Sequence, residues 1–462
     1  MTKILLINPP SELKNPVLPL GLASIAAYLQ EKQVDVSVID AWAEKLSFNK
    51  LSQQVTQNQA DIIGIYMLSP RYDQAKKTIE VCRQSLPNSI IVAGGPHTSA
   101  MPIETLNEIP ELDVCVIGEG EKTMYELTTK KLSEVNGIAY RNKNGKLVLT
   151  QLREYIKDLD NLPFPSRDLF PLEKYKPAPP MARKESCYTM ITSRGCPYQC
   201  TYCSKDVFKD VYRTLSPKRV CDEIEELITK YKAEEIPFLD DDFSMNIKRA
   251  EAICDEIIKR KLKFRWSCST RVDQVNEQLL KKMKQAGCWL ICYGVESGNQ
   301  KILNSINKGF TIDQVISSFE MTRKIGILTL SSFMVGLPNE TKETIQETFN
   351  LVKKIKPNFI SCSMLMVFPG SRLFKLIKSG KYQGKLKVLK KEERIPGVFL
   401  KGNYIAFENN LTFEELKKII QKITRDFYLR PQYIIQFIKT IKSFSDFKYY
   451  LKGALKVLKS VI

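Results

Sequence analysis

The chain has 462 residues, of which 43% are hydrophobic and 26% are charged, an ordinary globular composition that excludes a disordered or fibrous protein. Its length predicts several domains, with hydrophobic cores large enough to be stable without disulfide bonds. Lys and Arg total 70 against 51 Asp and Glu, and this net charge of +19 favours partners with negative surfaces, while a single histidine limits imidazole chemistry.

The start of the chain and its cysteines indicate the compartment. Lys3 leads directly into a strand-like run, without the basic and apolar segments of a signal peptide. No uninterrupted apolar run approaches the roughly 18 residues needed to span a membrane. Twelve cysteines are too sparse for a disulfide scaffold, which favours metal ligands or buried thiols. We therefore expect a cytoplasmic protein that is soluble or contacts a membrane only peripherally.

Residues 1–135 alternate strand-like and helical segments. Helical periodicity, as at Leu22, Ile25, Ala26 and Leu29, separates short continuous apolar runs at residues 4–8, 36–39, 62–67, 90–93 and 114–117. Buried strands separated by helices predict an α/β domain with a doubly wound, Rossmann-like parallel sheet. Its ligand is expected outside the carboxyl ends of the strands. Alone, such a domain could bind a flavin, a nucleotide or nothing.

Residues 136–185 connect this domain to the next. Residues 137–150 predict a hairpin that turns at Asn144 and Gly145. The proline-rich stretch at 159–180 predicts a linker that crosses to a second domain.

Residues 186–375 show a second alternation of strands and helices. Helical patterns at 220–231, 250–259 and 312–323 separate apolar strands that end at Thr192, Leu239, Cys268, Val295, Val335 and Val367. Six βα units without a dinucleotide-type glycine loop predict a partial (β/α)6 barrel of the TIM type. Its chemistry is expected at the carboxyl-terminal rim.

Residues 376–462 are predicted to form a basic helical region. From residue 372 onwards there are 21 Lys and Arg against 7 Asp and Glu, which is most of the net positive charge. Beyond Tyr433, apolar residues recur at helical spacing with lysines on the other faces. Such helices can lie on an anionic membrane, or they can simply pack on the barrel.

A cysteine triplet follows the first strand of the predicted barrel. Cys196, Cys200 and Cys203 stand in the sequence CPYQCTYC, with Tyr202 just before the last cysteine. Three thiolates on one loop can hold three irons of a cubane cluster and leave the fourth iron open. The alternative is a zinc site, but zinc would want a fourth ligand and no histidine lies near. The spacing therefore favours an iron–sulfur cluster.

This motif resembles that of the radical S-adenosylmethionine (SAM) enzymes. The resemblance implies a [4Fe-4S] cluster whose open iron chelates the amino and carboxylate groups of SAM. Reductive cleavage of SAM would then give a 5′-deoxyadenosyl radical, which abstracts hydrogen from an unactivated carbon.

Further SAM-binding positions are implied by the same resemblance. The motif FLDDDF makes Asp240, Asp241 and Asp242 candidates for the methionine amine, although one of three adjacent carboxylates is often solvated or a helix cap. Arg271 is a candidate for the methionine carboxylate and equally a structural partner of Asp273.

Later strand ends match the family in the same way. In YGVESG, Glu296 and Ser297 are similar to the pair that contacts the ribose. The stretches at 333–341 and 367–371 resemble strand ends that flank adenine. The remaining nine cysteines are expected to be buried thiols; Cys288 and Cys292 share an x3 spacing, but WLI between them is strand core with no loop for an auxiliary cluster.

The first domain resembles the cobalamin-binding subgroup of these enzymes. The shared stretches are INPP, PLGLASIAAYL, GGPH and GEGE, and the resemblance runs from about residue 3 to 425. It implies cobalamin as a cofactor. Glycines would let the backbone approach the corrin or its tail closely, unless they only form turns. The implied cofactor-binding residues are Gly21, Gly94, Gly95, Gly118, Glu119 and Gly120.

The sequence departs from classical cobalamin domains at one point. Those domains carry Asp-x-His-x-x-Gly after the first strand, whereas this chain has Asn8, two prolines, Ser11, Glu12 and Leu13. The departure predicts cobalt without a protein imidazole below it. The sole histidine, His97, is expected to be a hydrogen-bonding wall of the cobalamin pocket rather than a metal ligand.

The resemblance implies a cobalamin-dependent radical SAM enzyme, with methyl transfer to a lipid-like or apolar small molecule as the leading hypothesis. One alternative is an oxidative cyclase like the anaerobic Mg-protoporphyrin monomethyl ester cyclase. A non-enzymatic scaffold stabilised by metal is another. Flavodoxin or ferredoxin would donate electrons, and the basic tail would contact a membrane. Nucleic acid is not an expected partner, because no RNA-binding module is recognisable.

Overall fold

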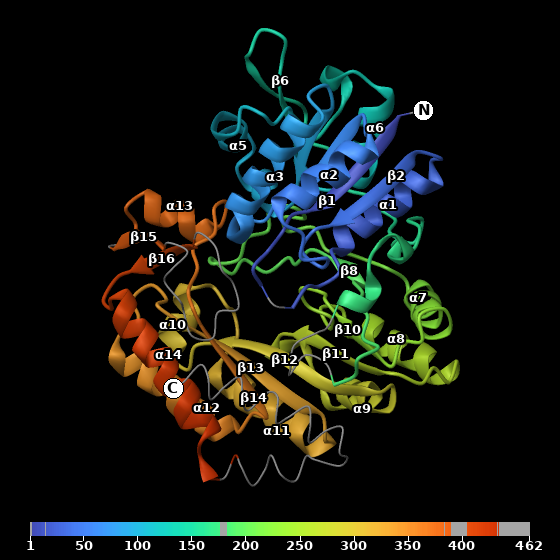
Figure 1. The fold of residues 1–462 in the computed structure, drawn as a ribbon. Coiled ribbons are helices and arrows are strands. Elements are labelled where there is room, and N and C mark those ends of the chain that lie inside the picture. Colours follow the sequence, from blue (N-terminus) through green and yellow to red (C-terminus); the bar gives the residue numbers. More distant parts are fainter. Residues whose placement is uncertain are drawn as a thin grey trace.

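A computed structural model of the chain describes residues 2–13, 15–175, 183–382, 384–389, 404–431 and 433. Two sheets, one mainly and one wholly parallel, form its two main bodies, and helices cover both (Figure 1). The first domain, blue to teal, lies above the barrel, which runs from green to orange (Figure 1). This arrangement confirms the predicted fold class.

The N-terminal sheet has the order β2-β1-β3-β4-β5-β6-β7, and its first five strands are parallel. Because β2 and β3 flank β1 on opposite sides, the strand order reverses there, which is where ligands bind in such sheets. The strands are β1 Lys3–Asn8, β2 Asp35–Asp40, β3 Ile62–Tyr66, β4 Ile90–Gly94, β5 Val114–Val116, β6 Ile138–Arg141 and β7 Leu147–Leu149.

Both faces of this sheet are covered by amphipathic helices. Buried residues of α1 and α6 pack on one face, and buried residues of α2, α3 and α5 form a separate cluster on the other. The continuous apolar strands are therefore buried on both sides, as their sequence predicts. The helices are α1 Leu20–Glu31, α2 Phe48–Asn58, α3 Tyr72–Ser85, α4 Pro96–Ala100, α5 Pro102–Glu108 and α6 Glu121–Thr129.

The predicted hairpin and linker belong to the packed structure. β6 pairs antiparallel with β5, so the hairpin continues the N-terminal sheet beyond residue 135. In the linker, Arg167 has no exposed surface and donates to Glu223 at 2.7 Å and to the Thr189 carbonyl at 3.1 Å. The Tyr175 hydroxyl donates to Asp40 at 2.6 Å. The linker thus bonds to both domains.

The barrel sheet has five parallel strands in the order β10-β11-β12-β13-β14. The predicted first strand is present only as two isolated parallel bridges, which join Cys187 to Glu235 and Met190 to Phe238. The strands are β10 Glu235–Phe238, β11 Arg265–Thr270, β12 Cys288–Glu296, β13 Leu328–Val335 and β14 Phe359–Met364. The helices are α7 Pro217–Thr229, α8 Ile247–Lys259, α9 Glu277–Gln285, α10 Gln300–Ser305, α11 Ile312–Ile325, α12 Lys342–Ile355 and α13 Arg372–Lys378.

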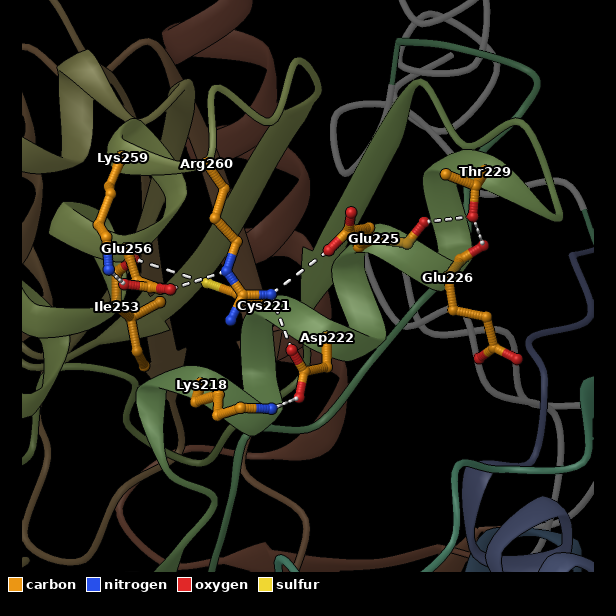
Figure 2. Close-up of polar contacts among 10 residues, drawn as sticks. All are labelled: Lys218, Cys221, Asp222, Glu225, Glu226, Thr229, Ile253, Glu256, Lys259 and Arg260. Carbon is orange, nitrogen blue, oxygen red and sulfur yellow. Dashed lines mark hydrogen bonds and ion pairs between the residues drawn. The ribbon is translucent and has the colours of Figure 1, made fainter.

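Ion pairs join neighbouring helices on the outside of the barrel. Figure 2 shows Arg260, at the end of α8, reaching Asp222 and Glu225 of α7 at 2.7 and 3.4 Å. Its Nε also donates to Glu256 at 2.7 Å. Buried Cys221 lies in the same contact, with its Sγ 4.0 Å from the Ile253 carbonyl oxygen (Figure 2). This thiol therefore fills the seam between α7 and α8.

The C-terminal region contains strands as well as a helix. β15 Lys385–Leu389 and β16 Tyr404–Glu408 pair antiparallel, so the prediction of a wholly helical region is incomplete. α14 Phe413–Tyr428 packs its apolar face against β14. The predicted amphipathic tail at 434–462 lies outside the described residues. Within the part of the chain that is described, no helix has the length and apolar character needed to cross a membrane.

Candidate active site

The cysteine loop spans residues 195–212 and is closed at its base by a two-residue ribbon. β8 Ser193–Arg194 pairs antiparallel with β9 Arg213–Thr214, so Arg194 faces Arg213 where the loop leaves and returns. Gly195 has φ +85°, and a Cβ there would stand 2.2 Å from the Val211 carbonyl oxygen. The two ends of the loop can approach this closely only because residue 195 is glycine.

The three motif cysteines are free thiols on this loop, whereas the other nine cysteines are all buried, as predicted. Cys196 and Cys200 are half-buried and Cys203 is exposed. Partial loss of water around the sulfur raises the pKa of Cys196, and the same effect with the charges of Cys200 and Asp241 raises the pKa of Cys203. Among the described residues, no group of His, Cys, Asp and Glu is spaced to hold a single metal ion. A cubane takes one thiolate per iron, so three soft thiols on one loop fit that cluster.

The three adjacent aspartates after β10 lie in different environments. Asp240 is buried and accepts from the Thr192 amide and hydroxyl at 3.1 and 2.9 Å, and from the Ser193 hydroxyl. These bonds hold the start of the cysteine motif against β10. Asp241 is exposed to solvent on one side, and the protein atoms packed around the rest of its carboxyl group, together with the Asp240 charge, raise its pKa. The Asp240 carboxylate thus binds groups of the protein itself, at Thr192 and Ser193.

Asp242 and Arg271 each keep an unused polar atom. Asp242 is buried and accepts from Thr270 at 2.8 Å, and burial raises its pKa to about 6. Arg271 pairs with Asp273 through Nε and Nη2 at 2.9 and 2.8 Å and lies 3.6 Å from the Tyr198 ring centre. Among the described residues, Asp242 Oδ2 and Arg271 Nη1 are buried without a partner. An anionic and a cationic atom are therefore available at neighbouring strand ends.

Glu296 ends β12 in a left-handed conformation, with φ +70°. Its Oε1 accepts from the Tyr202 hydroxyl at 3.0 Å and from Lys308 at 2.9 Å. Lys308 also donates to the Tyr202 hydroxyl at 3.1 Å. Ser297 is completely buried, and its hydroxyl lies 3.4 Å from that of Thr348 in α12. Lys308 is not predictable from the sequence, because its spacing from Glu296 matches no motif.

A cavity of about 290 Å³ lies between the two domains. A Cβ on Gly21 would meet no atom within 4 Å, so the absent side chain leaves room there. On Gly120 it would lie 2.6 Å from Ile25. The cysteine loop contributes Val207 and Phe208 to the same cavity. Six of the seven residues of the first domain predicted for the cobalamin pocket line it, namely Gly21, Gly94, Gly95, Gly118, Glu119 and Gly120.

Two of the predicted residues have other surroundings than expected. The Glu119 carboxylate is buried and bound by Arg194 and Arg213. His97 does not line the cavity of the glycines but a second one of about 250 Å³. Its Nδ1 lies 2.9 Å from the Ser69 hydroxyl, and burial lowers its pKa. His97 is therefore a neutral wall of a neighbouring cavity.

Residues 190–352 match the Radical SAM superfamily, and residues 11–128 match the B12 binding domain. An uncharacterized methyltransferase of Pyrococcus horikoshii is 34% identical, over 98% of both chains. This chain belongs to the cobalamin-binding radical SAM family. The anaerobic magnesium-protoporphyrin IX monomethyl ester cyclase of Rubrivivax gelatinosus is 33% identical to this radical SAM protein, over 77% of this chain and 65% of the cyclase.

Solved structures agree with the fold of this radical SAM enzyme. The methyltransferase TsrM from Kitasatospora setae, with cobalamin and a [4Fe-4S] cluster bound, superposes with a TM-score of 0.78 at 16% identity and covers 100% of this chain and 99% of its own. The family membership confirms an enzyme with three cofactors: the cluster, SAM and cobalamin. It argues against the scaffold alternative.

Proposed function

We propose that this radical SAM enzyme transfers a methyl group to an unactivated carbon of an apolar small molecule. The observation that carries the proposal is the shared cavity, whose wall combines glycines of the B12-binding domain with Val207 and Phe208 of the cysteine loop. A methyl donor and a radical source must both reach one substrate carbon, and this cavity is lined both by the glycines proposed for cobalamin and by the loop that carries the three thiols. When bound, the cluster and SAM supply the hydrogen-abstracting radical, and cobalamin supplies the methyl group.

The protein's own residues would bind and orient SAM at the barrel rim. Cys196, Cys200 and Cys203 would hold the cluster. Asp242 Oδ2 and Arg271 Nη1 suit the ammonium and carboxylate of a zwitterionic methionine, because both are buried and unused among the described residues. Asp241 is a less constrained alternative for the ammonium, and Glu296 with Ser297 remains the proposed ribose side.

We also propose the kind of substrate, the electron donor and the location of the enzyme. The second cavity carries Met366, Phe368 and Phe374 on its barrel side, which suits an apolar or lipid-like group. A net charge of +19 suits an acidic electron donor such as flavodoxin or ferredoxin. The enzyme would work in the cytoplasm with residues 434–462 against an anionic membrane; removing them should abolish co-sedimentation with anionic vesicles, and unchanged binding would refute the contact.

Oxidative cyclisation is the second candidate, because one of the relatives, at 33% identity, is a cyclase. Both reactions form 5′-deoxyadenosine from SAM. Methyl transfer also forms S-adenosylhomocysteine when cobalamin is methylated by a second SAM, whereas cyclisation does not require it. Quantifying the two products from one anaerobic incubation separates the candidates.

The deciding experiment replaces Cys196, Cys200 and Cys203 together by Ala. The wild-type protein, reconstituted anaerobically, should absorb near ~400 nm and form both products. The variant should lack that absorption and 5′-deoxyadenosine while still binding hydroxocobalamin. A matched control replaces Cys288 and Cys292, buried thiols with the same x3 spacing, and should retain the cluster. Persistent 5′-deoxyadenosine formation by the triple variant would refute the proposal.

A further inference from the structure

Both ends of the cysteine loop are bound by one carboxylate of the B12-binding domain. Glu119 Oε1 accepts from Arg194 Nη1 at 2.6 Å, and both Glu119 oxygens lie 2.9 Å from Arg213 Nη1. Glu121 Oε1 accepts from Arg194 Nη2, also at 2.6 Å. Arg194 and Arg213 are the paired residues at the base of the loop. We call these four residues the clamp.

The clamp is nearly excluded from solvent, and its two carboxylates balance its two guanidinium groups in charge. The side chains of Glu119 and Glu121 are 3% and 5% exposed, and those of Arg194 and Arg213 are 14% and 8% exposed. Glu119 Oε2 also accepts from the Ile156 amide at 2.9 Å. Removing one partner of such a buried network leaves an uncompensated charge, so its geometry is strongly specified. The clamp therefore restricts how the cysteine loop sits on the first domain.

The clamp also adjoins both cofactor regions directly. Glu119 lies between Gly118 and Gly120, and all three line the cavity that the glycines form. Arg194 lines the same cavity and is separated from Cys196 only by Gly195. The 118–120 turn is thus connected through two guanidinium groups to the loop that carries the thiols.

We propose that Glu119 is a positioning residue that couples cobalamin binding to SAM binding. This inference rests on the proposed function for its purpose, but its test needs no turnover. Cobalamin in the glycine-lined cavity fixes the 118–120 turn and, through Arg194 and Arg213, the cysteine loop. SAM then binds to a loop that is held more firmly in place, so its affinity rises. By linkage, SAM raises the affinity for cobalamin by the same factor.

The test measures SAM dissociation constants on the cluster-loaded enzyme, with and without hydroxocobalamin. The wild-type affinity for SAM should rise about fivefold or more with cobalamin. In Glu119→Gln the ratio should fall to about one when the same comparison is made on protein that carries its cluster, with hydroxocobalamin at a saturating concentration. An unchanged ratio in Glu119→Gln, or no effect of cobalamin in the wild type, would overturn the inference.

Two further variants complete the test. Glu126→Gln is the matched control, because Glu126 also pairs with an arginine, Arg153, but lies away from the loop; it should keep the full ratio. Glu121→Gln removes only the bond to Arg194 Nη2, so cobalamin should raise its affinity for SAM by an intermediate factor. This variant tests the coupling if Glu119→Gln does not fold. Coupled binding without S-adenosylhomocysteine would refute methyl transfer and leave the coupling standing.

Discussion

Lys308 and Glu296 form a buried ion pair, with 2.9 Å between Nζ and Oε1 and with side chains only 7% and 10% exposed. The same Glu296 oxygen accepts from Tyr202, which lies between Cys200 and Cys203. Burial and the Glu296 charge raise the pKa of Tyr202, so its hydroxyl stays protonated and donates. The pair thereby anchors the centre of the cysteine loop to the end of β12.

Lys308→Met should destabilise the protein by about 3 kcal/mol, because it leaves a buried carboxylate without its cation. Urea unfolding of the variant and the wild type measures this loss. Lys301→Met, at an exposed position of α10, is the control and should change the stability by less than about 0.5 kcal/mol. Equal stability of Lys308→Met and the wild type would show that the pair contributes nothing.

Gly195→Ala should prevent the cysteine loop from closing. A Cβ would stand 2.2 Å from the Val211 carbonyl oxygen, and φ is +85°. Gly145 has a similar φ of +75°, but a Cβ there would meet no atom within 4 Å. Gly145→Ala therefore measures the cost of the backbone conformation without a steric clash. That control should lose about 1 kcal/mol, whereas Gly195→Ala should lose several times more and bind less iron. Similar iron content in both variants would contradict this steric explanation.

Glu340 should make the stability depend on pH. It is buried, accepts from the Gly336 and Leu337 amides at 2.6 and 3.2 Å, and burial raises its pKa from 4.5 to about 8. Between these two values the folded state keeps a proton that the unfolded state releases. Its contribution to stability is therefore fully present below pH 4.5 and falls as pH rises, by at most about 1.4 kcal/mol per unit.

Thermal midpoints at pH 6 and pH 8 test this expectation. The wild-type midpoint should drop on going to pH 8, and Glu340→Gln should reduce that drop, because an amide oxygen can accept the same bonds without titrating. A drop of the same size in Glu340→Gln would assign the pH dependence to other groups.

Arg260→Gln should weaken the contact between α7 and α8 by about 1 kcal/mol, because three partly exposed carboxylates lose a shared cation (Figure 2). Lys259→Gln is the neighbouring control, with its side chain 78% exposed and a single ion pair at 3.3 Å. Its effect should stay within about 0.5 kcal/mol. Chemical denaturation of both variants compares them, and a larger loss in Lys259→Gln would reverse this ranking.

The strands were predictable because short continuous apolar runs in the sequence indicate which segments are buried. The apolar run at 4–8 corresponds to β1, and the run at 90–93 to β4, since strands covered on both faces need continuous apolar residues. The three cysteines were equally readable, because their spacing is short and the loop is local.

Contacts that depend on tertiary structure were not predictable. Glu119 meets Arg194 across 75 positions of sequence, and no local pattern records that pairing. His97 was expected in the cobalamin pocket, yet Pro96 lines the first cavity and His97 the second. Both stand in α4, where successive side chains point about 100° apart, so neighbours in sequence face different spaces.

Tyr428 gives α14 a role at the margin of the barrel sheet. Its hydroxyl accepts from the Ile360 amide at 3.2 Å and donates to the Ile360 carbonyl at 3.0 Å, on β14, the last strand of that sheet. These are the bonds that an additional strand would otherwise make there. A chain shortened before residue 413 would leave that border unprotected, and its copies would be prone to join edge to edge into aggregates.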